Sequence, residues 1–294
     1  MDSYLRIEDV PINLQNAQSV ELLESRFQGF LWRIEKIVCY TDCHCHLHER
    51  EFNNERLGQW MILWRKLGIA KIIAVTMDQK SITHTLQIHD RSIKESWPIT
   101  IFPAIGIHPW KAHKDYEIDF LLTVLNKLKK PIIGEIGLDH RFVPRKRWDM
   151  QAEVFEEMLC VAAKHSAPVT IHTKDAEVQV LDLLSSFDLP QVILHWFTGP
   201  LTQARSALER GYCFSITPAI NYSHVLKYIA QNAPLEQLML ESDGPMGYKL
   251  PFGKIIGTPG WIPMIARRIC QLRESERFED LVQTIESNIT RFLE

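Results

Sequence analysis

The sequence predicts an α/β fold, a (β/α)8 TIM barrel, built as a single domain with an N-terminal helical extension. Short apolar runs rich in β-forming residues recur eight times along the 294 residues, and stretches with helical periodicity follow them. A barrel of about 250 residues fits this length. A doubly wound open sheet is the alternative, but no GxGxxG motif follows an early strand.

The expected elements alternate along the chain. The eight strands are expected at residues 37–42, 70–76, 101–107, 131–137, 168–172, 191–195, 212–216 and 237–243. The helices between them include residues 55–67, 118–128, 147–165 and 202–210, which are long enough to connect parallel strands.

Two regions do not follow this alternation. Residues 1–36 form the N-terminal extension, in which residues 20–32 have the periodicity of an amphipathic helix. We expect this helix to cover the bottom of the barrel domain, residues 37–294, with docking of a protein partner as the alternative. A Gly/Pro-rich loop between Asp243 and Arg267 follows the last strand and is expected at the barrel mouth.

Composition excludes several classes of protein. With 46% hydrophobic residues, the chain can bury a sizeable core and is neither disordered nor fibrous. Its net charge of −3 excludes nucleic-acid binding through bulk positive charge. No apolar run is long enough for a membrane span, and the N-terminus has acids where a secretory signal has basic residues, so we expect a cytoplasmic protein with no membrane partner. The six cysteines form no CxxC pair, and we expect reduced thiols.

Metal-type side chains gather at the ends of the predicted strands. Side chains at the carboxyl ends of barrel strands converge on one pocket, and strand alternation directs the two histidines of DCHCH the same way. An unpaired carboxylate within the apolar segment PIIGEIGL would be costly to bury, which favours a cation partner. The strand ends together supply six candidate metal ligands, His44, His46, Glu135, His172, His195 and Asp243.

Six such side chains exceed the three or four ligands of a tetrahedral zinc site, so the sequence predicts two divalent metal ions. A bridging carboxylate would hold them about 3.5–4 Å apart. The positive charge of two such ions outweighs the two carboxylates, so the pocket would attract a phosphodiester although the chain is acidic. Imidazole and carboxylate ligands suit Zn²⁺ or Mn²⁺, and the carboxylates with phosphate also suit Mg²⁺.

Five segments in order, DCHCHL, GEIGLD, PVTIH, LHWFTG and ESDGP, resemble the motifs of the TatD family of metal-dependent deoxyribonucleases, which are amidohydrolase-like TIM barrels. The resemblance covers about residues 37–294. It implies that one metal ion is held by His44, His46, Glu135 and Asp243, and the other by Glu135, His172 and His195. It further implies hydrolysis of nucleic-acid phosphodiesters, commonly as a 3′ exonuclease.

The catalytic residues expected for this reaction are Glu135, shared by the two ions, and Asp243, which would position the attacking water or accept its proton. GIHPW also resembles a family segment, and its His108 is expected either to touch the substrate or to have a structural role.

The chain departs from the family pattern at three places. It has HWFTG where the family usually has HCFSG, and HTKDA where the family has HxRxA. Lys174, a further candidate for substrate binding, therefore keeps the charge but not the planar fork of arginine. A basic stretch of the RGKRNEP type is replaced by GKIIGTPGW. A basic and aromatic segment instead follows the Glu135 strand, and we expect it either to bind DNA or to be a solvated helix start; its substrate-binding candidates are Arg145, Lys146 and Arg147.

The leading hypothesis is therefore a metal-dependent nuclease that acts on DNA, at single strands or ends, by a two-metal mechanism. The first alternative keeps the metals but hydrolyses an amide or ester, because related barrels use the same ligand types for acyl substrates. The second alternative is a subunit of a multi-protein nucleic-acid defence or processing complex, with the unusual N-terminal extension as the docking element.

Overall fold

Eight parallel strands, hydrogen-bonded in the order of the chain, form a nearly closed barrel, which confirms the predicted fold class. This computed structural model describes residues 39–52, 55–113, 118–250, 253–274 and 276–294. The predicted extension, residues 1–36, lies outside the described residues, as does its expected helix. The strands are β1 (Tyr40–Cys45), β2 (Ile69–Val75), β3 (Thr100–Ile105), β4 (Ile132–Asp139), β5 (Val169–Lys174), β6 (Val192–Leu194), β7 (Cys213–Ile216) and β8 (Leu238–Leu240).

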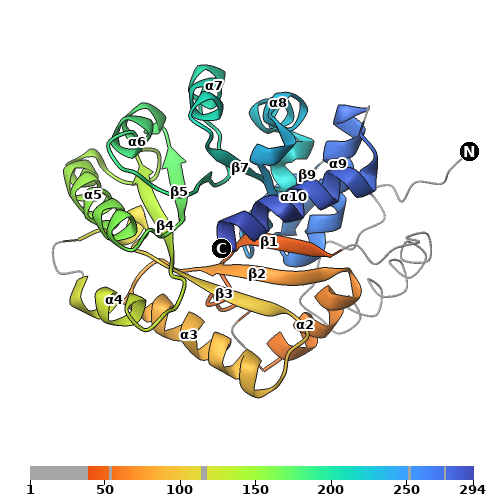
Figure 1. Cartoon of the computed structure of the whole chain (residues 1–294), viewed down its shortest axis with the longest axis horizontal. Coiled ribbons are helices and arrows are strands. Elements are labelled where there is room, and N and C mark those ends of the chain that lie inside the picture. The colour runs from red at the N-terminus through yellow and green to blue at the C-terminus, as the bar shows by residue number, and fades with distance from the viewer. Residues whose placement is uncertain (1–38, 53–54, 114–117, 251–252, 275) are drawn as a thin grey trace, which may run out of the picture.

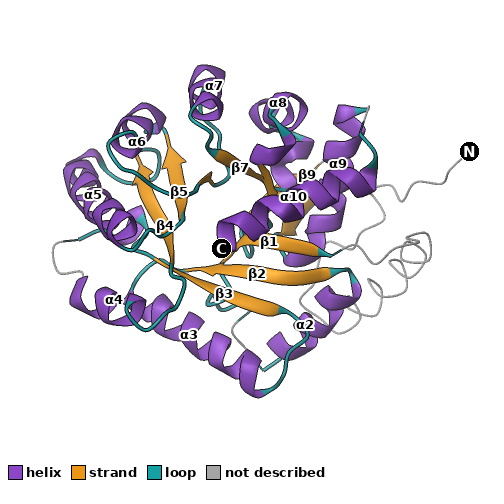
Figure 2. Ribbon diagram, in the orientation of Figure 1, coloured by secondary structure: helices purple, strands orange, loops and turns teal. Residues whose placement is uncertain are grey.

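Helices surround the strands on the outside of the barrel (Figures 1 and 2). They include α2 (Leu57–Lys66), α3 (Gln79–Lys94), α4 (Ile118–Leu125), α5 (Trp148–Lys164), α6 (Glu177–Leu184), α7 (Leu201–Glu209), α8 (His224–Asn232), α9 (Ile262–Arg273) and α10 (Phe278–Leu293). Short 3-10 helices connect several of them, among which η2 (Pro109–Lys111) follows β3 and η3 (Arg145–Arg147) follows β4. The described part of the chain contains no helix that is both long and apolar enough to cross a membrane.

Local sequence starts some of these helices directly after the strands. After β2, Asp78 accepts a hydrogen bond from the backbone of Ser81, and the Ser81 hydroxyl accepts one from the backbone of Asp78. This reciprocal cap satisfies backbone donors that the first turn of α3 would otherwise leave unpaired. Ser223 caps α8 through a single hydrogen bond, which its hydroxyl accepts from the backbone N–H of Leu226.

The barrel closes between β1 and the residues that follow β8. The backbone N–H of His46 donates to the carbonyl of Gly244, and that of Asp243 donates to the carbonyl of His44. Asp42 is fully buried, and its carboxylate accepts hydrogen bonds from the backbone and hydroxyl of Ser242. These contacts hold the two ends of the barrel together next to the strand ends that carry the candidate ligands.

The helix α10 closes the opposite, amino-terminal end of the barrel. Its Ile289 and Phe292 join an apolar cluster with side chains of β1 to β4 and β6 to β8, which is the barrel interior. Glu286 of α10 accepts hydrogen bonds from the backbone and hydroxyl of Thr41 in β1. Among the described residues, α10 therefore covers the surface that the sequence assigns to the N-terminal helix.

The Gly/Pro-rich segment after β8 lies at the carboxyl end of the barrel, as expected. It contains a hairpin of β9 (Gly247–Leu250) and β10 (Gly253–Ile256). Tyr248 is buried, donates its hydroxyl to the carbonyl of Ser242, and packs against Trp196, which follows β6. The hairpin thus forms part of the wall around the strand ends.

Candidate metal centre

β1 presents two histidines to the centre of the barrel mouth. His44 is fully buried and His46 nearly so, and their Nε2 atoms both face Asp243 and Glu135. The pairing of β1 with β2 shifts register between Asp42 and Cys45. Across this shift the chain places Cys43 in the barrel interior and Cys45 in the outer apolar layer, while both histidines lie in the mouth.

Glu135 in β4 lies between two groups of imidazoles. Its Oε2 is 3.3 Å from Nε2 of His44 and 3.4 Å from Nε2 of His46. Its Oε1 is 2.7 Å from Nδ1 of His172 and 3.4 Å from Nε2 of His195. The two carboxylate oxygens therefore face different histidines, which is the arrangement a shared ligand requires.

β4 can approach β5 closely because the site segment contains glycine. Gly137 has a φ of 144°, and a side-chain Cβ at this position would overlap the backbone of His172. Any other residue would push the two strands apart or force a rarely adopted conformation. The glycine therefore keeps Glu135 within reach of His172.

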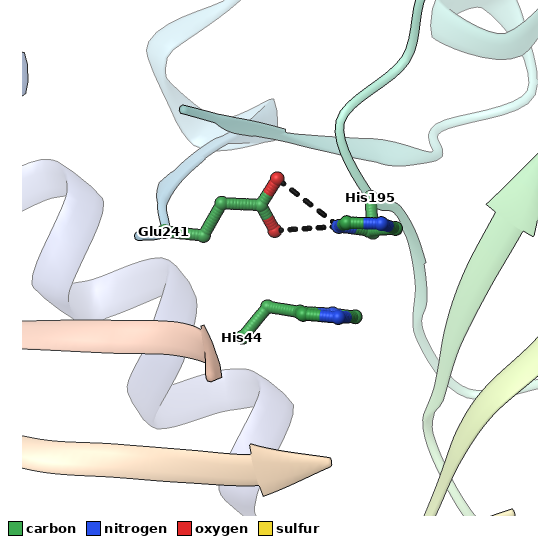
Figure 3. Close-up of side chains that lie close together, drawn as sticks. All are labelled: His44, His195 and Glu241. Atoms are coloured by element: carbon green, nitrogen blue, oxygen red, sulfur yellow. Dashed lines mark hydrogen bonds and ion pairs between the residues drawn. The ribbon is translucent and has the colours of Figure 1, made fainter. Parts of the chain in front are cut away.

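Two further carboxylates hold the second nitrogens of His172 and His195. Nε2 of His172 is 3.0 Å from Oδ2 of Asp139. Nδ1 of His195 is 3.2 Å from both oxygens of Glu241, which also accepts the backbone N–H of Trp196. Figure 3 shows the Glu241 carboxylate aimed at the His195 ring, with the ring of His44 stacked below it. Such carboxylates fix the orientation of an imidazole and raise its basicity as a ligand.

Asp243 follows β8 in an uncommon backbone conformation. Its φ is 45°, and its Oδ1 lies 3.4 Å from Nε2 of His46 and 3.7 Å from Nε2 of His44. Trp196 after β6 and Asp175 after β5 also have positive φ values. Conformations of this kind cost free energy in non-glycine residues and cluster at functional sites.

The buried charges perturb one another strongly. Burial opposes ionisation of Glu135, but the surrounding imidazoles outweigh burial and hold the pKa of its carboxyl well below the usual range. Burial would lower the pKa of His46, but hydrogen bonds to Asp243 and Glu135 raise it to about 10. Burial together with the neighbouring His44 lowers the pKa of His195. Metal ligands must give up their protons, so metal binding competes with the protons that these carboxylates favour.

The residues present fit divalent metal ions. Nε2 of His44 and Oε2 of Glu135 are buried without a hydrogen-bond partner among the described residues, although they face each other. Unpaired buried polar atoms are costly unless another ligand satisfies them. Three groups of side chains bring their ligand atoms within 4.8 Å of one another: His44, His46 and Asp243; His108, Glu135 and His172; His44, His195 and Glu241.

The comparison with known protein families agrees with this geometry. The model of the family described as "TatD related DNase" matches residues 41–294. The chain belongs to the TatD family.

Relatives of this TatD protein are named as deoxyribonucleases or as metal-dependent hydrolases. It is 27% identical to the "Putative deoxyribonuclease tatdn3" of Danio rerio over 219 residues, which cover 70% of this chain and 80% of that protein. It is 26% identical to the "Uncharacterized metal-dependent hydrolase YabD" of Bacillus subtilis, with 85% of this chain and 97% of that protein covered. The crystal structure of YjjV, a TatD homolog from Escherichia coli, superposes with a TM-score of 0.76 at 24% identity and covers 88% of this chain and 99% of that one. This TatD protein is a hydrolase.

Of the predicted substrate residues, His108 lies inside the centre. Nδ1 of His108 accepts the backbone N–H of Trp110, so in the neutral ring the proton is on Nε2, which is 3.4 Å from Oε1 of Glu135. Burial lowers the pKa of His108 to about 4. The neutral ring therefore presents an N–H donor to the centre of the TatD site.

The predicted basic residues occupy three different environments. Lys174 is buried, donates to the backbone carbonyl of Trp196, and places its Nζ 4.8 Å from the centre of the Trp196 ring. Arg147 donates to the backbone carbonyls of Trp110 and Ala112, so it holds η2 in place. Two more basic side chains are exposed on η3: Arg145 and Lys146.

Asp139 and Glu241 also belong to the centre, although they were not predicted as site residues. Both are fully buried and lie at or just after the ends of strands that carry predicted ligands. The spacing in the sequence could have revealed them. Asp139 lies four residues after Glu135, and Glu241 lies two residues before Asp243. Strand alternation places residues an even number of positions apart on the same face. One carboxylate was predicted from each of these strand ends, whereas each strand end contributes two.

Proposed function

We propose that this TatD protein is a two-metal phosphodiesterase that cleaves DNA at single strands or ends, as a 3′ exonuclease. The observation that carries the proposal is the position of Glu135, whose two oxygens face different histidines at 2.7–3.4 Å. Relatives named deoxyribonucleases, from Danio rerio and Homo sapiens, support DNA as the substrate.

In this proposal His44, His46, Glu135 and Asp243 hold one ion, and Glu135, His172 and His195 hold the other. Bound Mg²⁺, Mn²⁺ or Zn²⁺ ions supply Lewis acidity to the phosphodiester and lower the pKa of water. Asp139 and Glu241 keep the rings of His172 and His195 in the tautomer and orientation that ligation needs. The centre therefore depends on eight side chains: six hold the ions, and Asp139 and Glu241 orient two of those six.

Separate residues of the chain transfer the proton and stabilise the negative charge in this reaction. Asp243, beside His46 at the edge of the centre, orients the attacking water and accepts its proton as the oxygen bonds to phosphorus. The bond from phosphorus to the sugar oxygen breaks in line with this attack; the departing sugar oxygen takes a proton from solvent and leaves as a hydroxyl group, and Asp243 returns its proton to solvent. The Nε2–H of His108 donates a hydrogen bond to a non-bridging phosphate oxygen, on which negative charge increases.

The basic residues bind the DNA backbone in this proposal. Arg145 and Lys146 are exposed beside the mouth and contact phosphates of the strand beyond the scissile bond. Lys174, held by Trp196, adds positive charge inside the mouth. Arg147 contributes through η2, which it ties down through two backbone carbonyls.

The experiment that tests the proposal combines metal analysis with a substrate panel. We expect about two divalent ions per chain, and cleavage of single-stranded DNA that disappears with a chelator and returns with added metal. The panel includes duplex DNA, RNA, and an amide and an ester substrate. Turnover of an acyl substrate without DNA cleavage would replace the nuclease with the metal-dependent amide or ester hydrolase.

A further inference from the structure

Two exposed aromatic side chains stand beside the metal centre. Phe142 exposes 66% of its surface and Trp110 exposes 37%, although both are large apolar residues. Their rings contact each other edge to face, with centroids 5.9 Å apart. Single exposed apolar side chains are ordinary, but two aromatic rings that pack on each other at the mouth of a site need an explanation.

A continuous series of rings connects this pair to the proposed ligands. The ring of His172 lies 4.6 Å from that of His108, and the ring of His108 lies 5.0 Å from that of Trp110. Phe142 then contacts Trp110 on the solvent side. The exposed pair is therefore the outermost part of a wall that begins at Glu135 and its histidines.

Asp139 fixes the pair to the centre. Its Oδ2 accepts hydrogen bonds from the indole N–H of Trp110, at 2.6 Å, and faces His172. Its Oδ1 accepts the backbone N–H groups of Arg141 and Phe142. One buried carboxylate thus positions a proposed metal ligand, the indole of Trp110 and the backbone of Phe142, while the two aromatic rings stay exposed.

We propose that Trp110 and Phe142 form a stacking platform for an unpaired nucleobase of the strand whose phosphodiester lies in the metal centre. This inference rests on the proposed function and adds to it a reason for acting on single strands. Bases stack on aromatic side chains without regard to sequence, but only after they have left the double helix. The exposed Arg145 and Lys146 follow Phe142 on η3 and supply the charge for the adjacent backbone.

The test compares a Phe142→Ala variant with the unmodified protein on two single strands. One strand carries ordinary bases, and the other carries tetrahydrofuran abasic residues at its last three 3′ positions. We expect Phe142→Ala to lower kcat/KM about tenfold on the first strand and less than twofold on the second, because only the first has a base to stack. Phe142→Trp should restore cleavage of the ordinary strand.

A matched control separates stacking from a general surface effect. Ile93→Ala removes an equally exposed apolar side chain from α3 (65% exposed) and should leave kcat/KM unchanged on both the ordinary and the abasic strand. Blunt duplex DNA should be cleaved more slowly than the single strand, and Phe142→Ala should narrow that difference. Equal losses on the ordinary and abasic strands, or no loss on either, would overturn the platform.

A fluorescence measurement keeps the platform separate from catalysis. A strand with 2-aminopurine at its 3′ terminus should lose fluorescence on mixing with the metal-loaded protein, before cleavage, and should lose less with Phe142→Ala. Quenching that is unchanged in the variant would overturn the platform even if the protein cleaves DNA. Absence of cleavage on every strand would overturn the proposed nuclease, and the quenching would still decide whether the platform binds a base.

Discussion

The two halves of the candidate metal centre are supported differently, although Glu135 faces both of them. In the β5/β6 half, which contains His172 and His195, a buried carboxylate faces the second nitrogen of each ring. In the β1 half, which contains His44, His46 and Asp243, the hydrogen-bond partner of Nδ1 of His44 among the described residues is the hydroxyl of Thr170, at 3.2 Å. Nδ1 of His46 has no hydrogen-bond partner among the described residues.

This difference indicates that the β5/β6 half is fixed before a ligand arrives, whereas the β1 half has more freedom to adjust. A carboxylate behind an imidazole sets its tautomer and strengthens it as a ligand, and a neutral hydroxyl does so less. We therefore expect the β5/β6 half to bind its metal ion more tightly.

The largest effect is expected from Glu135→Gln, which removes the negative charge that faces both halves. We expect the variant to lose both metal ions and essentially all nuclease activity, because an amide is a poor bridge between two cations. Metal content after dialysis, measured by mass spectrometry, checks this. His46→Ala is the matched control, and it should lose only the ion of the β1 half. Two ions retained in Glu135→Gln would show that the carboxylate is not shared.

A smaller effect, confined to one half, is expected from Glu241→Gln. The change keeps the side-chain volume but removes the carboxylate behind His195, so metal affinity of the β5/β6 half should fall about 10- to 100-fold. Calorimetric titration of the metal-depleted protein measures both affinities in one experiment. If the β5/β6 half of the variant binds metal as tightly as that half of the unmodified protein, the role assigned to Glu241 is wrong.

Thr170→Val should have a weaker effect on the β1 half. It removes a neutral hydrogen-bonding group next to His44, and such groups contribute only about 0.5–1.5 kcal/mol, or about two- to tenfold in affinity. The same titration applies, with Thr170→Ser as the control that keeps the hydroxyl. A loss larger than that of Glu241→Gln would reverse the comparison between the halves.

The smallest effect at physiological salt is expected outside the centre, at Arg145 and Lys146. Replacing both with glutamine should leave metal content unchanged and reduce the salt dependence of KM for single-stranded DNA, by a slope of about 0.7 for each lost phosphate contact. Kinetics at several salt concentrations provide the slope. A slope equal to that of the unmodified protein would show that Arg145 and Lys146 are solvated surface residues that do not bind DNA.

The strands were predicted well because short apolar runs that alternate with helical segments allow few other positions for the strands or orders of the strands in the sheet. All eight strands lie within a few residues of the expected ranges, and the six expected ligands come together at the barrel mouth. The motifs determine this, since each ligand follows directly from the end of an apolar run.

The supporting contacts could not be predicted in the same way. That Asp139 reaches His172 and Trp110, and that Glu241 reaches His195, depends on side-chain positions across different strands. Arg147 is equally instructive, because its guanidinium contacts the backbone of η2, which no local pattern around residues 145–147 indicates. Contacts between segments far apart in sequence are visible only after folding.

The helix α10 has a consequence for how the chain is made. Synthesis proceeds from the amino terminus, so all eight strands leave the ribosome before the segment that carries Ile289 and Phe292. Until then the base of the nascent barrel presents apolar side chains to water, and Thr41 lacks its Glu286 partner. The newborn chain therefore has a period in which chaperone capture or self-association competes with completion of the fold.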